Sequence, residues 1–69
     1  MPEIQVSRYG TTIKAVAVFR HVSYWTILRL VKEGRIPSEF RHGRYFIDTE
    51  WFDREREKEM YRQRYLKAN

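Results

Sequence analysis

Basic and aromatic side chains stand together in one short run of this sequence, residues 22–37, and their chemistry suits a polyanion. Arg29 and Lys32 lie three positions apart, and Tyr24 and Trp25 come about one helical turn before Arg29. The guanidinium of arginine makes forked contacts with phosphate or with a guanine edge, whereas lysine acts as a point charge. A Tyr hydroxyl and a Trp indole N–H can donate to phosphate while their rings contact thymine methyl groups. We therefore expect a surface that binds phosphates and base edges.

The same run carries the signals of a helix with a defined start and stop. Ser23 can accept hydrogen bonds from the free backbone N–H groups of a first turn, and Gly34 can supply a left-handed stop. Ile27, Leu30 and Val31 are spaced so that they fall on one side of this helix and face a core. The candidate contact residues of this helix are its cap, Ser23, and the residues on the opposite side: Tyr24, Trp25, Leu28, Arg29 and Lys32.

A shorter helix is expected just upstream, with Thr12 as its cap. Its apolar residues recur at helical spacing: Ile13, Val16, Ala17 and Phe19. The connection to the next helix is only residues 20–22, and two helices joined so tightly form a helix-turn-helix. The histidine in this connection, His21, either avoids a positive φ or tolerates it.

Beyond the second helix the sequence changes from helical to extended. Pro37 prevents continuation of the helix. Residues 40–41 and 44–47 are rich in aromatic and β-branched side chains and indicate two short strands, with His42 and Gly43 at the turn between them.

The tip of this hairpin, or wing, should collect positive charge. Tyr45 and Ile47 share the strand face that should meet the core, which leaves Arg44 on the other face. Basic side chains at such a tip can contact phosphate or enter a narrow minor groove. The residues expected there are Arg41, His42, Gly43 and Arg44. An alternative role for Arg44 is an ion pair with Glu39 across the hairpin.

A third helix is expected after the hairpin. Asp48 is suited to cap it, and Trp51 and Phe52 can anchor it on the core. Residues 53–59 contain no apolar side chain, so residues 53–69 should form a solvated helix or a tail. Apolar residues return at helical spacing near its end, where they can fold back, contact another molecule or fray: Met60, Tyr61, Tyr65 and Leu66.

Charge is distributed unevenly along the chain. The 69 residues carry a net charge of +5. Residues 1–47 hold eight cations against three acids, whereas residues 48–69 hold six of each. The basic surface therefore belongs to the helix-turn-helix and the hairpin, which is the electrostatic pattern of nucleic-acid binding.

Composition also argues against several classes of protein. The chain has no cysteine, and its two histidines have no metal-ligand spacing. No glycine-rich phosphate loop or nucleophile with an adjacent base can be identified. We therefore expect no enzyme, metal or cofactor. With no apolar run of membrane-spanning length and no signal peptide, the expected location is the cytoplasm of a bacterial host, at the nucleoid.

The predicted fold is a single α+β domain over residues 1–69, mostly α, with its core in residues 11–52. The order helix, turn, helix, Gly, Pro, hairpin and helix resembles the excisionase family of recombination directionality factors, small winged-helix proteins related to the DNA-binding domain of MerR regulators. The similarity runs from about Thr12 to Phe52. It is carried by Val22-Ser23, residues 26–34, Ile36-Pro37, Gly43-Arg44 and Ile47.

The resemblance implies a winged helix-turn-helix with a two-stranded wing and a sequence-specific, DNA-bending function. The second helix would enter the major groove, with Arg29 at a base edge and Lys32 at a phosphate. The wing would lie against the adjacent minor groove. Implied partners are double-stranded DNA, an integrase that the protein directs toward excision of a prophage or mobile element, and further copies bound cooperatively.

Two other functions stay open at this stage. One is a small phage-type transcriptional repressor with no role in recombination. The other is a protein-interaction module, in which exposed apolar side chains such as Trp25, Leu28 and Phe46 bind another protein. Trp25 and Leu28 can also simply pack against the wing or the third helix.

Overall fold

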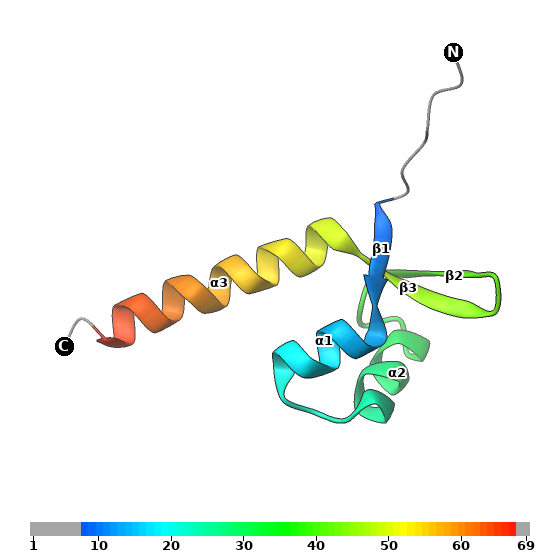
Figure 1. Cartoon of the computed structure of the whole chain (residues 1–69), viewed down its shortest axis with the longest axis horizontal. Helices are drawn as coiled ribbons and strands as arrows, with labels where there is room; N and C mark the ends of the chain where they lie inside the picture. Colours follow the sequence, from blue (N-terminus) through cyan, green and yellow to red (C-terminus); the bar gives the residue numbers. More distant parts are fainter. Residues whose placement is uncertain (1–7, 68–69) are drawn as a thin grey trace, which may run out of the picture.

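Three helices and a three-stranded antiparallel sheet make up the part of the chain that the computed structural model describes, residues 8–67 (Figure 1). Along the chain they are β1 (Tyr9–Thr12), α1 (Ile13–Arg20), α2 (Tyr24–Lys32), β2 (Ser38–Arg41), β3 (Arg44–Asp48) and α3 (Thr49–Lys67). The prediction of a small, mostly helical α+β domain is confirmed.

The two helices α1 and α2 begin at the predicted caps. The Thr12 hydroxyl accepts a hydrogen bond from the backbone N–H of Ala15 at 3.1 Å, and the Ser23 hydroxyl accepts one from Thr26 at 3.2 Å. Each cap satisfies a donor that has no partner inside its own helix. Between the helices, His21 adopts the left-handed conformation with φ 58°, so this histidine tolerates the positive φ that the turn requires.

The end of α2 also follows the predicted signal. Gly34 has φ 76°, and the backbone N–H of Arg35 donates to the carbonyl of Leu30 at 3.0 Å. This bond closes the last turn of the helix and satisfies one of its free carbonyl groups. The chain then passes through Ile36, which is buried, into β2.

The sheet has one strand more than the two that were predicted. Its order is β1-β3-β2, with β3 in the centre, and both pairings are antiparallel. Thr11 of β1 and Ser38 of β2 lie on either side of Ile47. The two-stranded hairpin was predicted, whereas β1 was not, because β1 contains Gly10, has no alternating apolar pattern and pairs with a strand far along the chain.

The core lies between the sheet, α1, α2 and the first turn of α3. Ile47 is fully buried, as predicted, and Tyr45 on the same strand face is half-buried against it. The rings of Phe19 and Phe52 meet edge to face at 5.5 Å, which anchors α3 on α1. The buried apolar residues among those described are Ile13, Val16, Ala17, Ile27, Val31, Ile36, Ile47 and Phe52.

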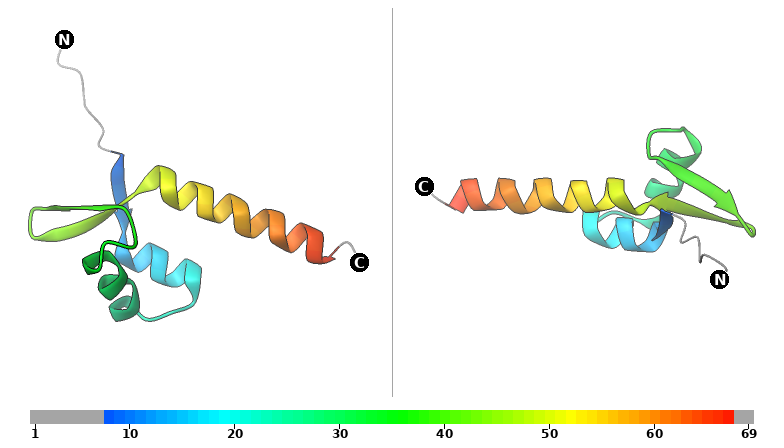
Figure 2. Two further views of the ribbon diagram at one scale, coloured as in Figure 1. Left: turned by 180° about the vertical axis from the view of Figure 1, so that it is seen from behind. Right: turned by 90° about the horizontal axis from the view of Figure 1, so that it is seen from above.

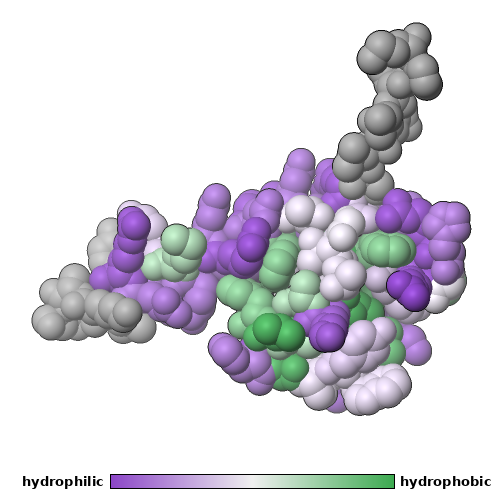
Figure 3. All heavy atoms as spheres, in the orientation of Figure 1, coloured by the Kyte–Doolittle hydropathy of each residue, from purple (hydrophilic) through white to green (hydrophobic). Residues whose placement is uncertain are grey.

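Beyond its first turns α3 extends away from the rest of the domain, in the direction opposite to the β2–β3 hairpin (Figures 1 and 2). Hydrophilic residues cover most of it, whereas paler and hydrophobic colours gather over α1 and α2 (Figure 3). An ion pair at 3.5 Å joins Arg20 of α1 to Glu55 of α3. The predicted helix runs to Lys67, and its residues 53–64 are exposed or half-buried, as expected of a solvated helix; residues 68–69 lie outside the described residues.

Asp48, at the junction of β3 and α3, ties three elements together. Its carboxylate accepts hydrogen bonds from the side chain of Arg8, just before β1, with Nε at 3.1 Å and Nη2 at 2.5 Å. It also caps α3 by accepting from the backbone N–H groups of Glu50 at 2.9 Å and Trp51 at 3.3 Å. The side chain is only 1% exposed, so these donors replace water around the charge.

These contacts make the stability of the fold depend on pH. The Arg8 hydrogen bonds, together with the backbone donors of α3, lower the pKa of Asp48 below its ordinary 3.8 in spite of its burial. A carboxyl whose pKa is lower in the folded state stabilises the fold above its unfolded pKa and loses that contribution as the pH falls through the folded value.

We therefore predict that the free energy of unfolding of the parent protein falls as the pH is lowered below about 4. Asp48→Asn should cost about 1–3 kcal/mol near neutral pH, because the Arg8 pair is lost, and should flatten this dependence. Urea denaturation followed by circular dichroism at several pH values measures both effects. Asp53→Asn, which removes an exposed ion pair with Arg56, is the matched control and should change little. An equal loss in both variants would contradict the role assigned to Asp48.

Candidate nucleic-acid interface

A groove of about 600 Å³ separates α2 from the β2–β3 hairpin, and the start of α1 also lines it. Helical geometry explains why α2 contributes what it does. Ile27 and Val31 point into the core, so residues 24, 28 and 32, which follow one another at intervals of four, line the adjacent side. The full lining is Thr12, Ile13, Lys14, Tyr24, Leu28, Lys32, Phe40, Gly43, Arg44, Tyr45 and Phe46.

The groove is positively charged. Its three cations come from three different elements, namely Lys14 of α1, Lys32 of α2 and Arg44 of β3, and its lining contains no Asp or Glu. None of the three makes an ion pair among the residues that the structure describes. Three cations without ion-pair partners around one groove form a surface to which an anion is attracted.

Five of the ten predicted contact residues line this groove: Tyr24, Leu28, Lys32, Gly43 and Arg44. Two others, Trp25 and Arg29, line a neighbouring shallow hollow of about 350 Å³ on the outer side of α2. Leu28 and Lys32 border both hollows. The exposed face of α2 is therefore one continuous surface that runs from Arg29, across Leu28 and Lys32, to Arg44.

The aromatic residues of α2 lie at its first turn and face solvent. Trp25 is 72% exposed, so the alternative that it packs against the hairpin or α3 is wrong. Leu28 is half-buried and packs partly on the core, so part of its role is structural. The rings of Tyr24 and Trp25 meet edge to face, with their centres 5.6 Å apart. This contact favours one orientation of the Tyr24 hydroxyl relative to the Trp25 indole N–H.

The tip of the hairpin is a tight turn of two residues. His42 and Gly43 both have positive φ, 53° and 75°. Positive φ at both central residues is characteristic of a type I′ turn, which is favoured in two-residue hairpins because its twist matches that of the strands. A Cβ at position 43 would meet no atom within 4 Å, so glycine is favoured there by its backbone conformation and not by lack of space. The turn places Arg41 and Arg44 directly opposite each other.

The two arginines of the tip have different environments. Arg44 is exposed, whereas Arg41 folds back along the sheet. Its Nη2 donates to the carbonyl of Tyr9 at 3.0 Å, its guanidinium lies 4.5 Å from the centre of the Phe46 ring, and Nη1 is 3.8 Å from Glu39. Arg41 therefore links the hairpin to β1 and stabilises the sheet. The ion pair recorded for Glu39 is with Arg41, not the one with Arg44 that was considered.

Ser23 also has a structural position. Its hydroxyl caps α2 and lies 3.0 Å from the hydroxyl of Thr26. It remains exposed at the first turn, beside Tyr24. Of the ten predicted residues, the structure thus brings seven together on the α2 surface and the groove, and gives Ser23, Arg41 and His42 positions at its edges.

Some groove residues were not among the predicted contacts. Lys14 was missed although an exposed lysine in the first turn of a helix beside a basic helix is a usable signal. Phe40, which is 62% exposed and contacts Tyr45 with the rings tilted and their centres 4.8 Å apart, was assigned only to a strand. No sequence signal placed these residues on the same side as α2, because that depends on how the hairpin packs.

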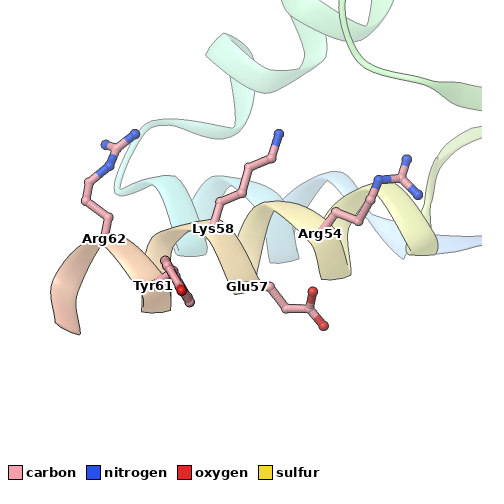
Figure 4. A pocket seen from close by; sticks show the side chains of 5 residues that line it. All are labelled: Arg54, Glu57, Lys58, Tyr61 and Arg62. Atoms are coloured by element: carbon pink, nitrogen blue, oxygen red, sulfur yellow. The ribbon is translucent and has the colours of Figure 1, made fainter. Parts of the chain in front are cut away.

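A further surface hollow of about 510 Å³ lies along α3 and is lined by Arg54, Glu57, Lys58, Tyr61 and Arg62. Figure 4 shows that the side chains of Arg54, Lys58 and Arg62 point to one side of the helix and those of Glu57 and Tyr61 to the other. They do not converge on an enclosed site. Among the described residues no cluster of His, Cys, Asp and Glu is arranged to hold a metal ion.

Comparison with protein-family models, with curated proteins and with solved structures finds no match for this chain. Within residues 8–67, none of the helices has the length and apolarity needed to cross a lipid bilayer.

The different environments of the two tip arginines predict different effects on stability. Arg41→Ala should lower the free energy of unfolding by about 1 kcal/mol, because it removes the hydrogen bond to Tyr9 and the contact with Phe46. Arg44→Ala should change it by no more than about 0.5 kcal/mol, since an exposed side chain with no ion pair is lost. Urea denaturation of the two variants measures the difference. Equal losses would show that Arg41 does not brace the sheet.

Proposed function

We propose that this protein binds double-stranded DNA as a winged helix-turn-helix, with α2 as recognition helix and the β2–β3 hairpin as wing. The observation that carries the proposal is the basic groove between α2 and the hairpin, whose three cations come from three elements and whose lining has no acid. Charge that is distributed along a groove favours an extended polyanion over a single small anion.

The dimensions of α2 support its assigned place. An α-helix with its side chains is about 10–12 Å in diameter, and the major groove of B-DNA is about 12 Å wide, so α2 (Tyr24–Lys32) can lie within it. Arg29, on the outer side of α2, is suited to a guanine edge. Lys32 and Lys14 are suited to the phosphates on either side.

The hairpin supports contact with the adjacent minor groove. Arg44 is exposed at its tip, and a narrow minor groove attracts arginine by its negative potential. A wing that enters the minor groove while a helix occupies the major groove favours bent DNA, since bending brings both surfaces into contact. Bending is therefore part of the proposed function.

The biological role that we propose is that of an excisionase, which directs an integrase toward excision of a prophage or mobile element. The proposal rests on the resemblance of residues 12–52 to that family and on the groove. A transcriptional repressor with the same DNA-binding surface is the second candidate. The exposed Trp25 also favours a protein contact, which an excisionase makes with its integrase and an isolated repressor does not require.

Binding to DNA should depend strongly on salt. If five or six phosphates are neutralised, the logarithm of the association constant should fall against the logarithm of salt concentration with a slope of about −5. Fluorescence anisotropy with a labelled duplex from the neighbouring intergenic region, at several salt concentrations, measures this slope. Absence of binding to any duplex at low salt would reject the proposal and would favour the protein-interaction module.

Substitutions should divide the surface into base-reading and phosphate-binding residues. Arg29→Ala should cost about 1–3 kcal/mol on the specific site and relax preference at one base pair, whereas Lys32→Ala should weaken all duplexes alike. Lys58→Ala, on α3, removes the same charge outside the groove and is the control. Equal losses for Lys32→Ala and Lys58→Ala would show that net charge alone, and not the groove, governs binding.

The choice between the two biological roles needs a separate measurement. An integrase encoded beside this protein should excise a segment flanked by its two attachment sites in vitro only when this protein is added. Arg44→Ala and Lys32→Ala should reduce excision in proportion to DNA binding. If excision is unaffected by the protein while transcription from an adjacent promoter falls, the repressor is the correct assignment.

A further inference from the structure

One side of α3 beyond the core carries a short stripe of residues that none of the preceding functions uses. Glu57, Met60, Tyr61 and Arg64 follow one another at i, i+3, i+4 and i+7, which places them on a single side of the helix. They line one shallow hollow of about 250 Å³. Met60 is 59% and Tyr61 61% exposed, so two large apolar side chains face solvent in the middle of this stripe.

The stripe is accessible because of where the helix lies. Phe52 is the last buried core residue of α3, and the helix continues from there to Lys67, a length of about 22 Å. In Figure 4 the side chains of Glu57 and Tyr61 point away from α1 and α2. A second helix can therefore lie along the stripe without displacing any part of the domain.

The charges of the stripe on one copy are complementary to those on a second, antiparallel copy. Glu57 and Arg64 stand at its two ends, with Met60 and Tyr61 between them. If two copies align antiparallel about a point between Met60 and Tyr61, Glu57 of each copy faces Arg64 of the other. Met60 of each copy then faces Tyr61 of the other. A two-fold arrangement of this kind repeats every favourable contact twice, which is the geometry of a symmetric dimer interface.

We propose that α3 is a self-association surface, on which a second copy of this chain binds antiparallel through Glu57, Met60, Tyr61 and Arg64. The contact spans about two helical turns and is smaller than a standard stable interface, so association should be weak and appear at about 0.1–1 mM protein. Copies held on neighbouring sites of one duplex would reach local concentrations of about this size. The surface itself involves none of the groove residues and does not depend on DNA.

Sedimentation velocity of the protein without DNA, from about 10 μM to 1 mM, tests the proposal. The sedimentation coefficient of the parent should rise with concentration. Glu57→Arg and Arg64→Glu should each weaken association about tenfold, because each places like charges opposite one another at both ends of the contact. Arg64→Glu lowers the net charge from +5 to +3. If association were governed only by repulsion between the net charges of two copies, this variant would associate more strongly than the parent.

Mixing the two variants makes the test specific. In an equimolar mixture of Glu57→Arg and Arg64→Glu proteins, each arginine again faces a glutamate, so association should return to about the parent level. Glu59→Arg makes the same charge change as Glu57→Arg on the opposite side of the helix and should leave association unchanged. A parent that stays monomeric at 1 mM, or a mixture that associates no better than the single variants, would overturn the proposal. Neither result bears on DNA binding by the groove.

Discussion

The buried carboxylate of Asp48 is the contact on which the arrangement of this small domain depends. It stands where the central strand β3 becomes α3, and it accepts hydrogen bonds from the Arg8 side chain and from two backbone N–H groups of α3. One charged group thus fixes the start of a strand and the start of a helix at the same point. The energetic reason is that a carboxylate with 1% exposure needs protein donors in place of water, so an arrangement that removes these donors leaves a buried charge without partners.

The position of the candidate interface follows from this junction. Because β1 is held beside β3 and leads directly into α1 through Thr12, the sheet and the helix pair cannot move independently. Arg41 adds a second tie between the hairpin and the carbonyl of Tyr9. The groove between α2 and the hairpin is therefore lined by parts of the chain that are packed on one shared core, as a preorganised binding surface requires.

Charge is segregated in space as well as in sequence. Most of the acidic residues lie on α3, which extends away from the groove, so Lys14, Lys32 and Arg44 lie around a groove whose lining holds no acid (Figures 1 and 3). On α3 itself, acids and bases alternate and form ion pairs within the helix, such as Arg62 with Glu59 at 3.8 Å. Such pairs favour helix over coil by a few tenths of a kcal/mol each, and the first turn is fixed by Asp48, Trp51 and Phe52. The end of the molecule with α2 and the hairpin thus carries the basic groove. The other end is α3, which has Arg54, Lys58 and Arg62 on one side and the stripe with Met60 and Tyr61 on another.

Local signals in the sequence were sufficient for most of the elements. Thr12, Ser23 and Asp48 cap helices by accepting hydrogen bonds from backbone N–H groups two or three residues further on. Gly34 and Gly43 adopt positive φ. The spacing of Ile27 and Val31 defines the buried side of α2. The sequence by itself therefore determined the helices, the hairpin and the charged residues of α2. Only the tertiary structure decided the third strand, the different environments of Arg41 and Arg44, and the place of Lys14 and Phe40 in the groove. Those features depend on pairing and packing between segments that are distant in the chain, and no short-range pattern records which partners meet.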